Sequence, residues 1–221
     1  MKKNNKWIGL ILLLMAVGLG CSTSRITTSW KAENIVLKRY NKIMVLGLIR
    51  EADRSIQVNM EDHLVADLKD LGYHAVSSFR EYGPKAFDNM DEDAAVGKLK
   101  NSGVDAVLTV VLLDKEKERK YYPGNISYSP YGYYYNRFWG YRTTLYRRIY
   151  EPGYYVTNTK YFWESNFYDM STQKLMYSVQ TQSFDPATSE SLGHEYGQMI
   201  MQDMVKNNVV GKVSDIPGKA F

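Results

Sequence analysis

The sequence predicts an α/β (α+β) fold, in which a single mixed sheet of about five strands carries helices packed on it. Two patterns predict this arrangement: apolar runs alternate with helical spacings up to residue 113, and a strand pair followed by a helix ends the domain. A third observation, an abrupt change of composition over residues 121–155, marks a tyrosine-rich insertion. The order strand, helix, strand, helix, strand favours parallel neighbours, because such strands need crossover connections.

The first half of the domain alternates strands and helices. Residues 42–49 (KIMVLGLI) form a nearly continuous apolar run, which is typical of a strand covered on both faces. A helix is predicted over 55–71, because apolar residues recur at helical spacing up to Gly72. Its apolar stripe consists of Ile56, Met60, Leu64, Leu68 and Leu71. A strand over 74–77, a helix over 91–100 and a buried strand over 105–113 (DAVLTVVLL) are predicted to follow.

The second half predicts a hairpin and a final helix. Residues 156–168 and 174–183 are rich in Thr, Tyr, Phe and Val and are separated by turn residues, which indicates an antiparallel hairpin. After Asp185-Pro186, a helix is predicted over 189–206. Its apolar side consists of Leu192, Tyr196, Met199, Ile200 and Met204. Residues 211–221 are predicted to be a frayed C-terminal tail.

The N-terminus has the order of a secretory signal. Lys2, Lys3 and Lys6 precede an apolar run over 7–19, which ends at the small residue Gly20. This run is shorter than the roughly 20 apolar residues that a membrane-spanning helix needs, so a permanent span is the weaker interpretation. The only cysteine of the chain, Cys21, follows directly. The alternative is a free cysteine beside an ordinary cleavage site, although exported proteins usually pair or lose their thiols.

The segment Gly18-Leu19-Gly20-Cys21 resembles the bacterial lipobox. That pattern prefers Leu three places before the cysteine, where this chain has Gly18, and a small residue directly before it, which Gly20 supplies. The resemblance implies that residues 1–20 are a lipoprotein signal peptide and that Cys21 carries diacylglycerol and an acyl chain, which attach the protein to a membrane. Ser22 stands where an Asp often retains such proteins in the inner membrane, so the resemblance implies the outer membrane, and we expect a periplasm-facing orientation.

The remaining chain divides into a tether, a domain and a tail. Residues 21–40 are predicted to be the lipidated N-terminus and tether, because Ser22–Ser29 is polar and lacks an apolar period. The α/β domain is predicted over 41–210, with the insertion at 121–155. Beyond residue 20 the chain has 25 Lys+Arg against 24 Asp+Glu, a net charge of +1, so no nucleic-acid partner is indicated.

Three stretches together resemble small outer-membrane lipoproteins of an anticodon-binding-like α/β architecture. They are KIMVLGLI with the helix through LKDLGYHAV, SGVDAVLTVVL, and NFYDMSTQKLMYSVQTQS with the last helix. Similar proteins include the penicillin-binding-protein activator lipoproteins, the amino-terminal domain of the Tol system's periplasmic propeller protein and the curli secretion-channel subunit. Lipoproteins with an uncharacterised domain and a Tyr/Gly-rich loop are more similar still. The resemblance covers 40–115 and 155–210 and rests on apolar patterns, so it implies a fold and no partner-binding residues.

The sequence contains no motif for catalysis. There is no His-Glu-x-x-His helix, no Gly-x-Ser-x-Gly turn and no phosphate-binding glycine loop. His63, beside Glu61 and Asp62 on a charged helix face, and His194 are predicted to be solvated surface residues. The acids of 91–93 lie at a helix start, where the backbone dipoles favour negative charge. An acylated Cys21 has no thiol that could act as a nucleophile. Since these motifs are missing as well, we expect no enzyme, no cofactor and no metal.

The tyrosine-rich insertion is the candidate contact region. Exposed tyrosines can form a protein interface or stack on sugars, and nearby cations add further contacts. The candidate contact residues are Tyr131, Tyr133, Tyr134, Tyr135, Arg137 and Trp139. The alternative is that these rings cover the sheet or fold on themselves. We therefore expect a lipid-anchored, non-enzymatic envelope protein that binds or assembles with another envelope protein, with a peptidoglycan- or polysaccharide-binding module as the alternative and an enzyme third.

Overall fold

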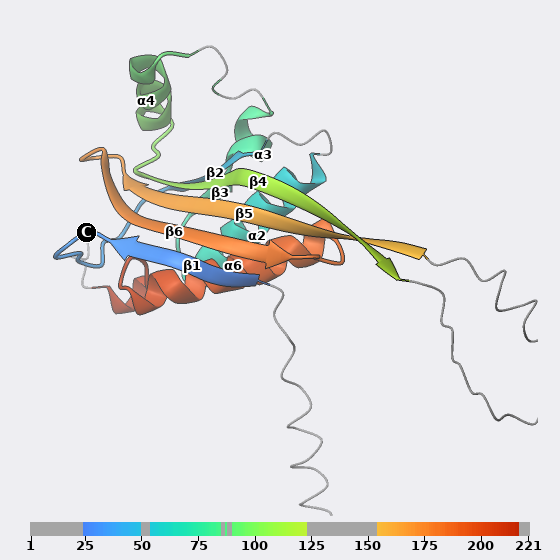
Figure 1. Cartoon of the computed structure of the whole chain (residues 1–221). Coiled ribbons are helices and arrows are strands. Elements are labelled where there is room, and N and C mark those ends of the chain that lie inside the picture. Colours follow the sequence, from blue (N-terminus) through green and yellow to red (C-terminus); the bar gives the residue numbers. More distant parts are fainter. Residues whose placement is uncertain (1–23, 50–53, 85–86, 88–89, 123–153, 217–221) are drawn as a thin grey trace, which may run out of the picture. The chain divides into compact units, whose positions relative to one another are not determined.

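The computed structural model describes residues 24–49, 54–84, 87, 90–122 and 154–216. The chain forms two compact units, one of Met1–Asp114 with Tyr161–Phe221 and the other of Lys115–Lys160. The first unit contains the helices and most of a six-stranded mixed sheet, which confirms the predicted fold class (Figure 1). None of the described helices has the length and apolarity that crossing a membrane requires.

The sheet has the strand order β1-β6-β5-β4-β2-β3. Its strands are β1 (Ser24–Lys31), β2 (Ile43–Leu48), β3 (Ala75–Ser77), β4 (Ala106–Tyr122), β5 (Tyr154–Asp169) and β6 (Lys174–Phe184). As the sequence predicts, β2 pairs in parallel with both β3 and β4. The described helices are α2 (Ser55–Asp70), α3 (Ser78–Tyr82), α4 (Glu92–Asn101), α6 (Ser189–Lys206) and the 3-10 turn η1 (Val213–Asp215).

The prediction of a tether over Ser22–Ser29 is wrong from Ser24 onward, because β1 pairs antiparallel with β6 along the edge of the sheet. All of β1 after Ile26 is exposed, so the strand needs no apolar period and is held mainly by its backbone pairing. Its first residue is also held by its side chain, since the buried Ser24 hydroxyl donates a 2.8 Å hydrogen bond to Oγ of Ser183. The first described strand therefore starts three residues after Cys21.

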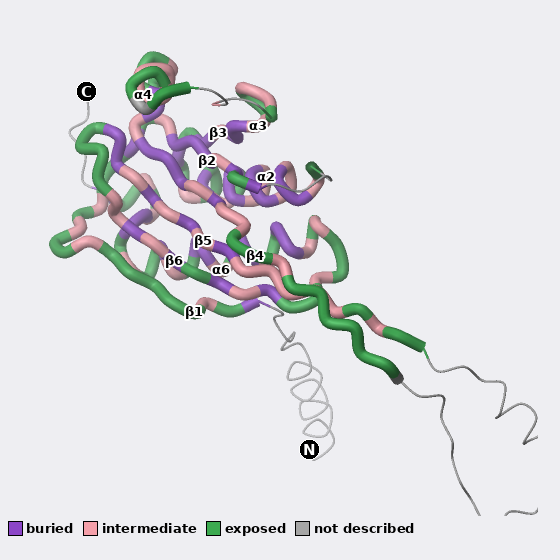
Figure 2. Tube along the Cα trace, turned by 45° about the horizontal axis from the view of Figure 1, so that its top comes forward, coloured by how far each residue is buried: buried purple, intermediate pink, exposed green. Residues whose placement is uncertain are grey.

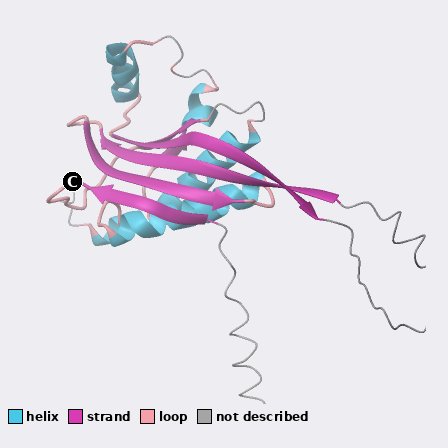
Figure 3. Ribbon diagram, viewed as in Figure 1, coloured by secondary structure: helices cyan, strands magenta, loops and turns pink. Residues whose placement is uncertain are grey.

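The main core lies between the sheet and the pair of helices α2 and α6 (Figure 3). Four residues of the predicted α2 stripe (Ile56, Met60, Leu64 and Leu68) are buried, and Leu71 is partly buried. The buried side chains of the strands alternate with less buried ones (Figure 2), as expected for strands that turn one face to the helices. A smaller apolar cluster on the other face packs Leu99 of α4 against Met44 and Val107.

Two local predictions are corrected by packing. Glu61, predicted on a solvated helix face, is completely buried and accepts five hydrogen bonds, which compensate for its loss of water. The part of the predicted frayed tail over 211–216 packs on the domain, because the amide of Val213 donates to the carbonyl of Leu71 at 2.8 Å and Ile216 is buried. Residues 217–221 lie outside the described residues.

The second unit contains the outer parts of β4 and β5. β4 extends to Tyr122, well beyond the predicted end at residue 113, and β5 begins at Tyr154. Within this unit the ammonium of Lys160 lies 3.6 Å from the carboxylate of Glu118.

Candidate functional site

Two glycines let α6 pack directly against α2. A Cβ atom on Gly193 would lie 2.9 Å from the carbonyl oxygen of Asn59, and one on Gly197 would lie 2.7 Å from Oδ2 of Asp67. The Asn59 carbonyl belongs to the backbone of α2, so a side chain at residue 193 would force the helices apart, whereas the Asp67 carboxylate would have to turn away from a side chain at residue 197. The two helices therefore contact each other at Gly193 and Gly197, in the N-terminal half of α6.

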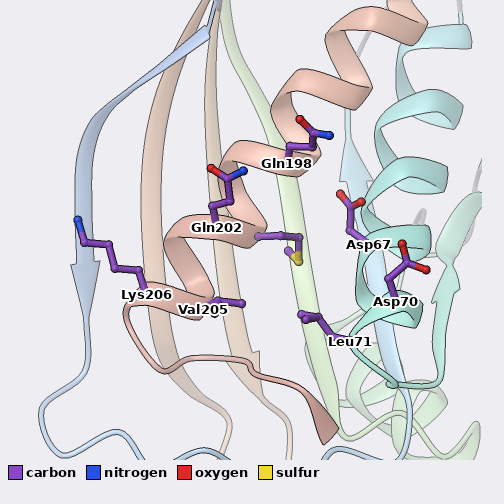
Figure 4. Close-up of a pocket in the computed structure, with 8 residues that line it drawn as sticks. Asp67, Asp70, Leu71, Gln198, Gln202, Val205 and Lys206 are labelled. Carbon is purple, nitrogen blue, oxygen red and sulfur yellow. The ribbon is translucent and has the colours of Figure 1, made fainter. Parts of the chain in front are cut away.

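Toward the C-terminal ends of both helices, larger residues replace these glycines and an open groove of about 450 Å³ lies between α2 and α6 (Figure 4). This volume falls within the range of about 300–1,000 Å³ that is common for ligand sites. Asp67, Asp70 and Leu71 line the groove from α2 and its end, and Gln198, Met201, Gln202, Val205 and Lys206 line it from α6.

The groove combines an apolar floor with a polar rim. Leu71, Met201 and Val205 supply the apolar surface, and Val205 is exposed. The α2 wall carries two carboxylates, whereas the α6 wall carries two amides and one ammonium. Such a set can hold a cationic group beside an apolar one, which is an arrangement for binding.

Burial raises the pKa of Asp67, the carboxylate nearest the helix contact. His63 and His194 lower this pKa, and Asp70 raises it further. The two imidazole rings meet edge to face, with their centroids 5.4 Å apart. The sequence placed both histidines on surfaces but did not predict that α2 and α6 bring them together. Among the described residues no group of three or more His, Cys, Asp or Glu side chains is arranged to hold a metal ion.

The sequence-predicted site residues lie elsewhere. Cys21 and the six candidate contact residues Tyr131, Tyr133, Tyr134, Tyr135, Arg137 and Trp139 are outside the described residues. The described ends of the insertion do bring aromatic rings together. In the second unit the exposed rings of Tyr121 and Tyr155 are 4.9 Å apart at a tilt of 47°, and the guanidinium carbon of Arg119 lies 4.9 Å from the centre of the Tyr155 ring.

No family model matches the sequence, and no curated protein matches it. Among solved structures, the dodecamer of a PelC variant from Paraburkholderia phytofirmans is similar, with a TM-score of 0.42 and 10% identity over 79% of this chain and 95% of that chain. Lipoprotein GNA1162 from Neisseria meningitidis is also similar, with a TM-score of 0.41 and 13% identity over 75% of this chain and 99% of that chain. Because both TM-scores are below 0.5, these likenesses assign the chain to neither protein's family.

Proposed function

We propose that this chain is a lipid-anchored protein of the bacterial cell envelope, held on the outer membrane by lipid on Cys21 and facing the periplasm. The lysines, the apolar run and the Gly-Cys junction within residues 2–21 support export and lipidation. The main described core draws its buried residues from the range between Tyr40 and Ile216. Cleavage before Cys21 would remove none of the described elements, the first of which starts at Ser24.

The anchored domain binds another envelope protein and performs no chemistry of its own. The groove between α2 and α6 is the observation that carries this proposal. Its apolar floor at Met201 and Val205 lies beside the carboxylates of Asp67 and Asp70. A partner segment with a Lys or Arg next to an apolar side chain complements this surface in both charge and polarity.

The raised pKa of Asp67 adds to the argument. Burial has taken this carboxylate partly out of water, and that loss of hydration raises its pKa. A cationic group of the partner, placed within about 4–6 Å, favours the ionised form and offsets the cost of burial. The partner's charge and the proton therefore compete for the same carboxylate.

Site-specific photo-crosslinking in intact cells tests this function. A crosslinking amino acid at Gln202, in the groove, should capture one partner protein, and the same group at the exposed Thr172 should not. Adding Asp70→Lys to the Gln202 variant should abolish that capture, because it reverses the charge of the groove wall. Capture that is equal at both positions, or that survives Asp70→Lys, would show that the groove is not the binding site.

A glycan-binding module that uses the tyrosine-rich insertion is the second candidate. The exposed Tyr121 and Tyr155 rings and the nearby Arg119 favour it, because exposed rings can stack on sugars. The two rings are tilted against each other, so they do not form one flat surface on which a sugar could stack, and this makes glycan binding the weaker candidate.

Replacing the tyrosines of the insertion tests this alternative. The variant carries Ser at Tyr131, Tyr133, Tyr134 and Tyr135. It should lose capture of peptidoglycan or outer-membrane polysaccharide while its melting temperature stays unchanged, because the described residues between Tyr40 and Ile216 form a core among themselves. A large fall in melting temperature would instead mean that the rings cover the fold, and unchanged glycan capture would rule out the insertion as the glycan site.

A further inference from the structure

Among the described residues, the sheet face that turns away from α2 and α6 is covered by a helix at one end only. There, α4 packs with Met44, Val107 and Tyr168 in the smaller apolar cluster. Toward the other end of the same face the apolar side chains are exposed: Leu48 by 51%, Leu113 by 52% and Phe184 by 41%. In Figure 1, α4 lies at the left of the sheet, and the start of β1 lies farther to the right along the strands.

Strand alternation places these residues on one face. Side chains one residue apart in a strand point to opposite faces. The neighbours Gly47, Trp163 and Ser183 are buried on the helix side, so Leu48, Phe162 and Phe184 point to the other side. By the same alternation from the buried Val110, Val111 and Leu113 point to that side as well. We call this set, one or two residues from each of the neighbouring strands β6, β5, β4 and β2, the open-face stripe: Leu48, Val111, Leu113, Phe162 and Phe184.

The open-face stripe lies in the part of the sheet where β1, the first described strand, begins. Ser24 pairs with Ser183, the neighbour of Phe184. On strands farther from β1, Leu48 at the end of β2 pairs with Val111 of β4. The strands β2 and β6 both end here. Along the chain β2 is followed by α2 and β6 by α6, and the two helices contact each other at Asn59 and Gly193.

The spacing between Cys21 and Ser24 limits how far this end can be from a lipid on Cys21. Three residues of fully extended chain span at most about 11 Å. Ser24 has no freedom to extend that reach, because its hydroxyl is bonded to Ser183 inside the sheet. With a lipid on Cys21, the edge of the sheet next to Phe184 is therefore held beside the headgroups.

We propose that the open-face stripe lies on the lipid bilayer that holds Cys21, so that the anchored domain rests on the membrane at this end of the sheet. Exposed aromatic and aliphatic side chains are favoured at the boundary between headgroups and acyl chains. Arg25 supports the same orientation, because its exposed guanidinium bonds to Gln182 at 2.9 Å, beside Phe184, and supplies a cation for anionic headgroups. This inference rests on the proposed lipid anchor.

This orientation assigns different tasks to the two surfaces. The groove between the C-terminal halves of α2 and α6 lies on the helix side of the sheet, whereas the open-face stripe lies on the opposite side near the N-terminal ends of the same helices. Contact of the stripe with lipid therefore leaves the groove accessible to a periplasmic partner.

Depth-sensitive fluorescence on the full-length, acylated protein tests the contact. An acylated Cys21 has no thiol, so Leu113→Cys introduces the single site for a thiol-reactive, polarity-sensitive dye. The labelled protein is reconstituted in vesicles of phosphatidylethanolamine and phosphatidylglycerol that contain spin-labelled lipid. Thr172→Cys, exposed in the turn between β5 and β6, is the matched control, and Leu48→Cys on another strand repeats the measurement independently.

We expect the spin-labelled lipid to quench the dye at Leu113 and at Leu48 several-fold more than the dye at Thr172. Equal, weak quenching at all three positions would overturn the orientation. A second result would also overturn it: the dye at Leu113 reports the same apolar surroundings in detergent as in vesicles, and the spin-labelled lipid does not quench it. A second copy or another protein segment would then cover the stripe. Mass analysis of the N-terminal peptide separates the two proposals: an unmodified Cys21 overturns the anchor together with the orientation, whereas an acylated Cys21 without quenching overturns the orientation alone.

Discussion

The backbone amide of Gly47 donates a 2.9 Å hydrogen bond to Oε1 of Glu61, which brings a carboxylate of α2 directly onto strand β2. A Cβ atom at residue 47 would lie 2.9 Å from that same oxygen, so the contact requires glycine. The other carboxylate oxygen accepts from the Ser77 hydroxyl and from the amide of Phe79. One buried side chain thus connects β2, α2 and the junction between β3 and α3.

Glu61→Gln should destabilise the domain even though it preserves the size of the side chain. The amide presents an NH2 group in place of one acceptor oxygen, so buried donors lose their partner, and each unsatisfied group costs about 1–3 kcal/mol. We expect the free energy of unfolding in urea to fall by about 2–4 kcal/mol. The neighbouring Asp62→Asn, which removes an exposed ion pair with Arg80, should cost less than about 1 kcal/mol. Equal losses for the two variants would contradict the role of Glu61.

Elements that bury an apolar stripe could be predicted from the sequence. The last helix occupies the predicted range 189–206, and the predicted stripe of α2 faces the core, because burial of every third or fourth residue leaves its spacing in the sequence. β1 could not be predicted in this way. An edge strand held by its backbone carries no apolar pattern, and Ser24–Lys31 has the polar composition of a linker.

The groove and the pair of histidines could not be predicted from the sequence, for a different reason. The groove and the pairing of His63 with His194 depend on which two helices pack together, and local spacing does not encode that choice. One signal was present: Gly193 and Gly197 lie four residues apart inside a predicted helix, where each glycine costs about 1 kcal/mol relative to alanine. Such a cost is compensated by close packing, which is what both glycines provide.

Alanine substitutions should separate these glycines from an unconstrained one. In Gly193→Ala the new methyl group meets the backbone carbonyl of Asn59, so the helices must move apart, and we expect a net loss of about 1–3 kcal/mol despite the better helix propensity. A methyl group added at Gly97 in α4 would meet no neighbouring side chain or element within 4 Å, so Gly97→Ala should stabilise by about 0.5–1 kcal/mol. Thermal unfolding of both variants measures the contrast, and a gain in both would mean that the helices do not touch at Gly193.

Cys21→Ser should abolish acylation and membrane attachment without unfolding the domain. The residue precedes the first described strand, and the buried residues of the described core come from the range between Tyr40 and Ile216, so we expect its replacement to leave their packing intact. Metabolic labelling with an acyl analogue measures the modification, and circular dichroism of the released protein measures the fold. Equal labelling of the wild type and the variant would exclude Cys21 as the lipid site.

Asp67 predicts a pH dependence whose sign follows from its surroundings. Burial raises its pKa above the ordinary value of 3.8, so the folded protein holds this proton more tightly than the unfolded chain does. The protonated carboxyl therefore contributes stability that is fully present below the ordinary value and is lost as the pH rises through the raised pKa. Asp67→Asn keeps the shape and cannot ionise. We expect this variant and the wild type to unfold at similar urea concentrations at acidic pH, and the variant to be the more stable of the two near neutral pH.

Asp70→Asn, on the exposed part of the same groove wall, should change the stability little at either pH. If the wild type were instead more stable than Asp67→Asn near neutral pH, the ionised carboxylate would be stabilised where it stands, by His63 and His194, and the groove would have no need of a partner's cation to offset its burial.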